Sequence, residues 1–273
     1  MISLELNPPS EPSFDELHEK IRKYNSFDAY IVTELAMMRE EDKWVDTMYT
    51  AIRLKESTGR RIIPVITSRE NTRRSFISRA LMAAHGGIEE LVIVRGDDSP
   101  FGGAFGMTVS EMIRTIRLLC RELSRRITIY VAANPTRDLK REVESAAEKL
   151  SLGADAVITQ PTLDADVLRD FINGLRERGF DNPVIGSIMI LDSKNTAERM
   201  ERRCGIRFPD WFKEELAGGN WKNALLKAVR EVTGICDGVH ISPIVKHEFS
   251  VQLAEEARKI LNSRYEPQPV FLP

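Results

Sequence analysis

The stretch Leu91-Val92-Ile93-Val94-Arg95-Gly96-Asp97 joins an apolar run to a cation, a glycine and a carboxylate. Consecutive apolar residues are typical of a strand that is covered on both faces. In a barrel of alternating strands and helices, the strand ends and the loops after them line the active site. The polar residues directly after this run therefore have two interpretations, as active-site residues or as an ordinary Gly-Asp turn. The residues at the other strand ends must decide between them.

Similar apolar runs recur along the chain, and stretches with apolar residues at three- and four-residue spacing separate them. We count about eight runs, which predict strands at Ile2–Leu6, Ala29–Thr33, Ile62–Thr67, Leu91–Val94, Ile127–Val131, Ala156–Thr159, Val184–Ile188 and Gly238–Ile241. The intervening patterns predict helices at Asp42–Lys55, Asn71–Ala84, Val109–Leu123, Arg137–Leu150, Asp164–Arg178, Asn195–Cys204 and His247–Leu261. Strand and helix therefore alternate from one end of the chain to the other.

This alternation predicts an α/β fold, a closed (β/α)8 TIM barrel formed as a single domain over residues 1–273. An open doubly wound sheet is the rival, but it would usually show a G-x-G-x-x-G motif after its first strand. Here the first strand is followed by Asn7-Pro8-Pro9. An extra helix is expected within Arg207–Asn223, and Ser13 ahead of Glu16 predicts a capping box.

Composition limits the classes of partner. With Lys+Arg 39 against Asp+Glu 41, the net charge of −2 favours neither nucleic acid nor an anionic membrane. No apolar run approaches the roughly 20 residues of a membrane span, and no secretory leader is visible. The 3 cysteines are widely spaced, which fits a reducing compartment. We expect a cytoplasmic protein with a small-molecule partner, and the sequence leaves its oligomeric state open, a homo-oligomer included.

The predicted strand ends carry polar residues that would meet at one end of the barrel. Glu5 lies within an otherwise apolar strand, where burial favours the protonated carboxyl and suits a general acid. The alternative is a carboxylate paired with Arg95 or Lys246 inside the barrel. Gln160 offers a donor and an acceptor, which could orient the amide edge of a heterocycle, although a satisfied amide at the rim is equally consistent with the pattern.

Several common types of site are not readable in the chain. The 4 histidines are scattered and form no H-x-H or H-E-x-x-H pattern, so no metal site is expected. Neither a G-x-S-x-G motif nor a Walker loop appears. Acid-assisted redox or transfer chemistry on a bound heterocycle remains the favoured hypothesis.

Ordered motifs along the chain resemble those of the 5,10-methylenetetrahydrofolate reductases. The motifs are Ser3–Pro9, Val32-Thr33, Val94–Asp97, Val131–Pro135, Gly153–Gln160, Cys204–Pro209 with Trp211, and Gly238–His240 with Lys246 and Glu248. The resemblance implies a flavoprotein oxidoreductase of one-carbon metabolism and methionine biosynthesis. It implies reduction of 5,10-methylenetetrahydrofolate to 5-methyltetrahydrofolate by a nicotinamide nucleotide or another redox partner, with FAD as cofactor.

By position, the resemblance implies Glu5 and Asp97 as catalytic residues, with Glu5 as the general acid and Asp97 near both flavin and pterin. It assigns Gln160, Asp97 and Lys246 to the folate or a related pterin, Lys246 standing where the family has Arg. The residues that it assigns to the flavin are Thr33, Arg95, Gly96, Asp97, Asn134 and Lys149.

The departures from the family pattern concentrate on the flavin side. Residues that differ from the family's flavin contacts are Leu6, Asn7, Glu34, Leu35, Val65, Asn134, Ser145 and Glu148. Glu148 places a negative charge where the family has an Arg beside the FAD diphosphate. FMN or no flavin are therefore alternatives to FAD. The alternative function is a non-enzymatic or partner-dependent pterin-binding barrel subunit that lacks a tightly held FAD.

Overall fold

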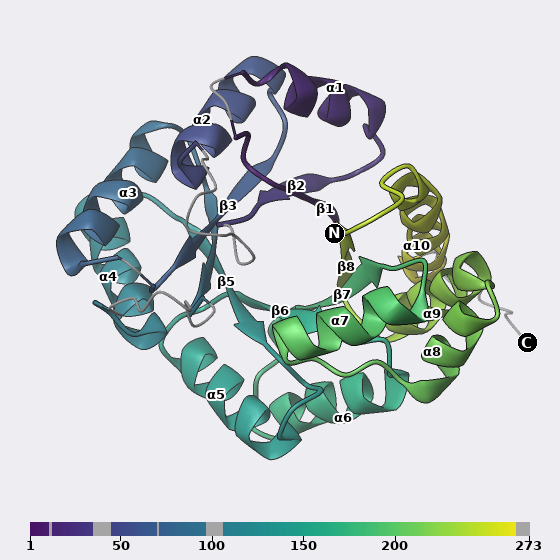
Figure 1. Cartoon of the computed structure of the whole chain (residues 1–273). Coiled ribbons are helices and arrows are strands. Elements are labelled where there is room, and N and C mark those ends of the chain that lie inside the picture. The colour runs from purple at the N-terminus through teal and green to yellow at the C-terminus, as the bar shows by residue number, and fades with distance from the viewer. Residues whose placement is uncertain (11–12, 35–44, 70, 97–105, 266–273) are drawn as a thin grey trace, which may run out of the picture.

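Eight parallel strands close into a barrel in chain order, with β1 paired to both β2 and β8 (Figure 1). The computed structural model describes residues 1–10, 13–34, 45–69, 71–96 and 106–265. The strands are β1 Ile2–Leu6, β2 Ala29–Val32, β3 Ile62–Thr67, β4 Glu90–Val94, β5 Thr128–Ala133, β6 Ala156–Pro161, β7 Val184–Ile190 and β8 Gly238–Pro243. The predicted (β/α)8 barrel is confirmed, and each strand lies within two residues of its predicted bounds.

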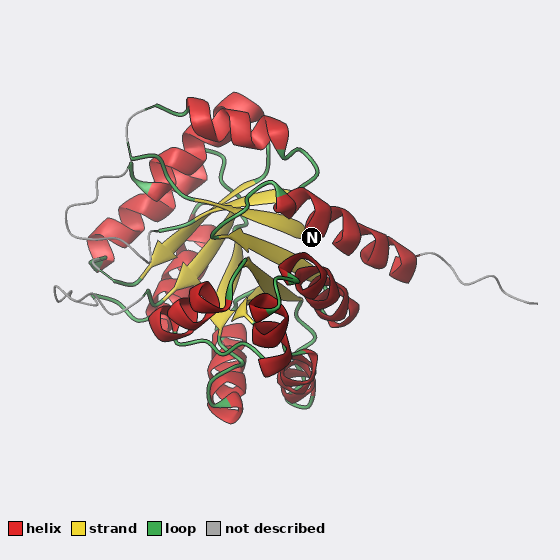
Figure 2. Cartoon of the chain, turned by 45° about the vertical axis from the view of Figure 1, so that its right-hand side comes forward, coloured by secondary structure: helices red, strands yellow, loops and turns green. Residues whose placement is uncertain are grey.

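Helices surround the strands on the outside of the barrel (Figure 2). In the described residues they are α1 Asp15–Lys23, α2 Thr47–Thr58, α3 Arg73–His85, α4 Val109–Glu122, α5 Leu139–Ser151, α6 Ala165–Arg176, α7 Lys194–Cys204, α8 Asp210–Ala217, α9 Trp221–Ile235 and α10 Phe249–Tyr265. The extra helix expected within Arg207–Asn223 is confirmed as α8. It ends at Ala217, and a separate, longer helix α9 that the sequence analysis did not predict begins at Trp221. None of the described helices has the length and apolarity needed to cross a membrane.

The first turns of α4 and α1 differ in how they are capped. Thr108 and Glu111 form a full capping box at α4, with each side chain bonded to the other's backbone N–H. The box predicted at Ser13 was wrong, since Phe14 is the N-cap of α1 and makes no side-chain cap bond. The Ser13 hydroxyl donates to the Asp15 carboxylate at 3.2 Å and accepts from the Asp15 backbone N–H at 3.4 Å, so both of its bonds go to Asp15 and none to Glu16.

Two apolar clusters account for the core. Outward-facing strand residues such as Leu4, Tyr30 and Ile93 pack with the helices in the larger cluster. The smaller cluster comes from alternate positions on the strands, which face into the barrel, and consists of Ala29, Ile31, Ile63, Val92, Tyr130, Ala156, Ile158 and Ile185. Its members come mainly from β2 to β6, so the interior is apolar on that side. The polar groups of the interior lie on the other side, which is formed by β7, β8 and β1.

Candidate active site at the barrel mouth

The inward-facing residues of β1, β7 and β8 form a polar sector inside the barrel. We define this polar sector as Ser3, Glu5, Ser187, His240 and Ser242. Strand register places Ser3 and Ser187 on either side of His240. The Ser3 hydroxyl lies 3.1 Å from His240 Nδ1, and both side chains are buried. A line of hydrogen-bonding groups therefore crosses the interior toward Glu5.

Glu5 is the carboxylate at the upper end of this line. Ser242 Oγ donates to Glu5 Oε1 at 2.8 Å, and His240 Nε2 lies 3.4 Å from Glu5 Oε2. The Glu5 side chain keeps 25% of its surface exposed, so it is less buried than the apolar strand pattern suggested. Among the described residues its nearest titratable partner is His240, and an ion pair with Lys246 does not form. A half-enclosed carboxylate held by two neighbours can exchange a proton with a ligand above it.

The sequence pattern did not identify His240 and Ser242 as partners of Glu5. The available signal was the alternation His240, Ser242 on β8, which puts both side chains on the face that Glu5 occupies on the adjacent strand β1. His240 was treated as an isolated strand histidine. Its role depends on the β1–β8 pairing, which joins residues more than 230 positions apart.

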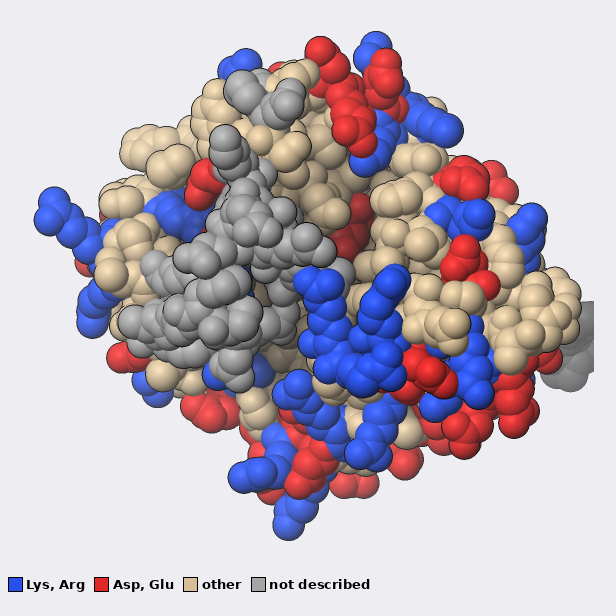
Figure 3. Space-filling view, in the orientation of Figure 1, with Lys and Arg blue, Asp and Glu red and all other residues tan. Residues whose placement is uncertain are grey.

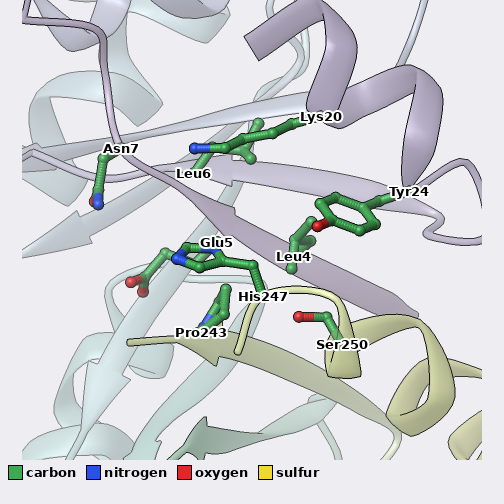
Figure 4. Close-up of a pocket in the computed structure, with 9 residues that line it drawn as sticks. All are labelled: Leu4, Glu5, Leu6, Asn7, Lys20, Tyr24, Pro243, His247 and Ser250. Carbon is green, nitrogen blue, oxygen red and sulfur yellow. The ribbon is translucent and has the colours of Figure 1, made fainter. Parts of the chain in front are cut away.

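Glu5 also borders a small cavity between β1, α1 and the segment after β8 (Figure 4). Lys20 and Tyr24 reach it from α1, and His247 and Ser250 from the other side. Its volume of about 20 Å³ is room for about one water and far below the size of a ligand pocket. Partial burial lowers the pKa of the His247 imidazole, and the positive charge of Lys20 acts in the same direction. This side of Glu5 is therefore closed to a pterin.

We call the end of the barrel at which the strands finish the mouth. Gln160 lies there, near the end of β6, and its side chain is exposed although its neighbours Thr159 and Pro161 are buried. A register shift between Ile158 and Pro161 turns this part of β6. The Gln160 backbone carbonyl accepts from Thr162 Oγ1 at 2.8 Å, and its side-chain amide bonds to none of the residues that the structure describes. Lys246 follows β8, is exposed, and has a left-handed φ of 52°.

The ends of β2 and β4 carry the residues expected at the flavin ring. Thr33 Oγ1 donates to Asn7 Oδ1 at 3.0 Å, so part of its hydrogen-bonding capacity is used within the protein. Arg95 is exposed, and its backbone carbonyl accepts from Ser68 Oγ at 3.0 Å. Gly96 has φ of 83°, and a Cβ there would lie 3.1 Å from Thr67 Cβ. The left-handed φ and this tight contact both favour glycine here. Asp97 lies outside the described residues.

An ion pair at the same edge was not foreseen from the sequence. Glu34 Oε1 lies 2.5 Å from Arg79 Nη1, and Glu34 Oε2 accepts from the Thr67 backbone N–H. The two side chains are 19% and 12% exposed, so their charges are poorly screened. Glu34 stands where the resemblance implies a Tyr. Its carboxylate therefore joins the end of β2 to β3 and α3.

The positions on β5 and α5 assigned to the cofactor are occupied by contacts within the protein. Lys149 Nζ donates to the Ala132 carbonyl at 2.9 Å, and desolvation lowers the pKa of this ammonium. Glu148 Oε1 accepts from Ser110 Oγ at 3.0 Å, which links α5 to α4. Asn134 Nδ2 donates to the Gly205 carbonyl at 3.0 Å. This face of α5 does not fit an FAD diphosphate in the way that the family resemblance implies.

Comparison with known proteins finds relatives among the methylenetetrahydrofolate reductases. The chain matches the family model described as Methylenetetrahydrofolate reductase over residues 1–238. It is 22% identical over 214 residues to the 5,10-methylenetetrahydrofolate reductase of Salmonella typhimurium, covering 77% of this chain and 71% of that protein. It is 27% identical over 165 residues to Methylenetetrahydrofolate reductase 2 of Schizosaccharomyces pombe, covering 54% of this chain and 26% of that protein.

A solved structure is similar over almost the whole chain. An uncharacterized protein from Clostridium thermocellum, described as binding two copies of 5-methyl-5,6,7,8-tetrahydrofolic acid, has a TM-score of 0.72 at 16% identity. The alignment covers 95% of this chain and 96% of that one. An aldolase named QR15 has a TM-score of 0.55, so the barrel alone does not fix the chemistry. The family model spans most of the residues, and on that ground the chain belongs to the methylenetetrahydrofolate reductase family.

Proposed function

We propose that this protein is an oxidoreductase that reduces 5,10-methylenetetrahydrofolate to 5-methyltetrahydrofolate, with Glu5 as the general acid. The observation that carries the proposal is the position of Glu5, held at the mouth by Ser242 at 2.8 Å and beside His240 at 3.4 Å. Membership of the methylenetetrahydrofolate reductase family supports the same reaction. A cytoplasmic location is part of the proposal, as the sequence predicts.

In the proposed step, protonated Glu5 gives its proton to a nitrogen of the bridging five-membered ring. The carbon–nitrogen bond to that nitrogen breaks, and the remaining nitrogen forms an iminium with the one-carbon unit. A hydride from a reduced carrier, either a flavin or a nicotinamide nucleotide, then adds to the iminium carbon and gives the methyl group. Ser242 and His240 keep the Glu5 carboxyl directed at the ligand, which is the positional requirement of acid catalysis.

Gln160, Lys246 and Asp97 complete the proposed folate site. The exposed Gln160 amide can donate to and accept from the pterin edge at the same time. Lys246, exposed after β8, supplies a cation for a carboxylate of the folate tail. Asp97 follows Gly96 in the sequence, and we assign it the electrostatic role between pterin and flavin that the family resemblance implies.

The proposed electron carrier is a flavin or a nicotinamide nucleotide. Thr33, Arg95 and Gly96 at the ends of β2 and β4 are compatible with a flavin ring, whereas Lys149 and Asn134 are committed to the protein. Purified protein should be mixed anaerobically with 5,10-methylenetetrahydrofolate and NADH or NADPH, with FAD, with FMN and without flavin. Formation of 5-methyltetrahydrofolate in any of these mixtures supports the reaction. The absence of product in all of them, with folate binding intact, contradicts it.

The closed face of α5 specifically favours a second candidate function, a pterin-binding barrel subunit without a tightly held FAD. The bond between Ser110 and Glu148 removes the surface on which the family resemblance places the diphosphate. Purified protein with folate affinity but no flavin absorption and no turnover unless a partner protein is added would favour this candidate over the first.

A further inference from the structure

His240 lies in the middle of a hydrogen-bonded line inside the barrel, with Ser3 at one ring nitrogen and Glu5 at the other. The Ser3 hydroxyl is 3.1 Å from Nδ1, and Glu5 Oε2 is 3.4 Å from Nε2. Ser3 is 0% exposed and His240 is 6% exposed, so water has little access to either side chain. The donors and acceptors of both side chains must therefore be satisfied within the protein.

The need to pair these groups selects one tautomer of the neutral His240 ring. Among the described residues, Nδ1 is the partner of the Ser3 hydroxyl. If Nδ1 carried the proton, the Ser3 O–H would lack an acceptor, and a bare Nε2 would face the Glu5 carboxylate. With the proton on Nε2, Ser3 donates to Nδ1 and His240 donates to Glu5. Because an unpaired buried donor is costly, the proton belongs on Nε2.

The other ionisable group of the interior is engaged elsewhere. Tyr130, which belongs to the inward-facing apolar cluster, bonds to Glu90 and Arg61. Within the part of the chain that the structure describes, the one titratable side chain that bonds to His240 is Glu5. The protonation of His240 and that of Glu5 are therefore linked mainly to each other.

The Glu5 end of this line opens to the mouth. Figure 3 shows a hollow at the centre of this face of the molecule, and acidic side-chain atoms are visible inside it. The Glu5 side chain is 25% exposed, whereas Ser3, two residues earlier on β1, is fully buried. A ligand in the mouth can thus take a proton from Glu5 without touching Ser3 or His240.

We propose that Ser3 is a positioning residue that holds His240 as the Nε2–H tautomer, and that this N–H stabilises the Glu5 carboxylate left after proton transfer. The inference rests on the proposed function, in which Glu5 gives its proton to a folate nitrogen. Once that proton has left, Ser242 donates to one carboxylate oxygen and His240 donates to the other.

These two donors favour the transfer because hydrogen bonds to a charged oxygen are stronger than those to a neutral carboxyl. They therefore stabilise the product of the step more than its reactant, which is the condition for catalysis. The distance of 3.4 Å from Nε2 to Glu5 Oε2 is long, as catalytic hydrogen bonds often are before the ligand binds.

The tautomer is tested on the resting protein, without turnover. The full chain is labelled with isotopic nitrogen in its histidines and studied by two-bond proton–nitrogen NMR at about pH 8, where an ordinary imidazole is neutral. The signals that disappear in His240→Gln identify His240 among the 4 histidines. We expect its proton on Nε2. A proton on Nδ1, alone or together with one on Nε2, overturns the proposal whether or not the protein reduces folate.

The effect on Glu5 is tested by the pH dependence of kcat/KM for folate reduction. His240→Met removes the N–H donor, so Glu5 should keep its proton to higher pH. The pH above which kcat/KM falls should rise by about one unit, the scale of one hydrogen bond to a charged group. His240→Gln places an amide N–H near the position of Nε2 and should recover most of the native profile. A native profile in His240→Met overturns the proposal.

Ser3→Ala tests whether Ser3 acts through His240. It should lower kcat/KM about tenfold in the native background and cause no further loss in His240→Met. Ser187→Ala is the matched control, because Ser187 is in register with His240 on β7, is 2% exposed, and has a hydroxyl without a described hydrogen-bond partner. It should leave the pH profile in place. A further tenfold loss from Ser3→Ala in His240→Met, or a Ser187→Ala profile that moves as far as that of His240→Met, contradicts the assignment.

Discussion

Replacing Ser242 with Ala should slow folate reduction, because Ser242 positions the proposed acid. Its hydroxyl donates to Glu5 Oε1 at 2.8 Å. The acid that acts is the protonated carboxyl, and a hydrogen bond between neutral groups contributes roughly 0.5–1.5 kcal/mol. Because the Glu5 side chain is only 25% exposed, water replaces little of the lost bond, and we take the upper end of that range. The expected loss in kcat/KM is therefore about tenfold.

A double-mutant cycle with Glu5→Gln separates positioning from an independent role. Glu5→Gln alone should lower kcat/KM by about 100-fold, the scale of general acid catalysis. If Ser242 acts only through Glu5, the double variant should also lose about 100-fold. Independent effects would multiply to about 1000-fold. The assay measures 5-methyltetrahydrofolate by chromatography under the conditions that give turnover in the native protein.

Ser26→Ala is the matched control for this cycle. Ser26 Oγ is buried without a described hydrogen-bond partner and lies between α1 and β2, away from the mouth. Its removal should leave kcat/KM unchanged within a factor of about two, because no hydrogen bond is lost. Multiplicative losses in the Glu5/Ser242 double variant, or unchanged turnover in Ser242→Ala, would refute the positioning argument.

Two further predictions concern stability and are read by thermal or urea unfolding. Tyr130 donates to Glu90 Oε2 at 2.8 Å, and burial together with the negative charge of Glu90 raises its pKa above the usual value near 10. The raised pKa contributes stability that is fully present below about pH 10 and is lost at higher pH. Tyr130→Phe should therefore cost about 1 kcal/mol at neutral pH and flatten the loss above pH 10, unlike Tyr49→Phe at an exposed site. Equal alkaline profiles for Tyr130→Phe and the native protein would rule this out. Gly96→Ala should cost at least about 1 kcal/mol more than Gly219→Ala, because both have left-handed φ but only Gly96 would press a Cβ against Thr67. Equal costs would mean that the close approach does not matter.

The strands could be predicted from the sequence because each is a short apolar run whose period is unambiguous. The apolar run of β6 correctly predicted that this strand starts at Ala156. The strand ends at Pro161, beyond a register shift that no local sequence pattern indicates. The start of α1 was missed because the Ser13 hydroxyl can bond to Glu16 or to the nearer Asp15, and both of its bonds go to the backbone and side chain of Asp15. Local competition of this kind is decided by a few tenths of a kcal/mol.

Some residues of the candidate site could be predicted from the sequence, and others could not. Glu5 and Gln160 follow from polar residues at the ends of apolar strands, and the structure brings both to the barrel. The partners of Glu5 on β8 depend on closure of the barrel between the first and last strands. The bond from Lys149 to the Ala132 carbonyl depends on how α5 packs against β5, and the sequence around Lys149 does not specify this packing. The bond from Asn134 to the Gly205 carbonyl likewise joins residues far apart in sequence, which no local pattern predicts.

The turnover of Glu5→Gln measured beside the native protein tests the central claim most directly. Gln preserves the size of the side chain and can still accept from Ser242, but it has no proton to give to the folate ring. We predict that the variant binds 5-methyltetrahydrofolate within about threefold of the native affinity and reduces 5,10-methylenetetrahydrofolate at least about 100-fold more slowly. Native turnover in a variant that binds folate normally would contradict the assignment of Glu5 as the general acid.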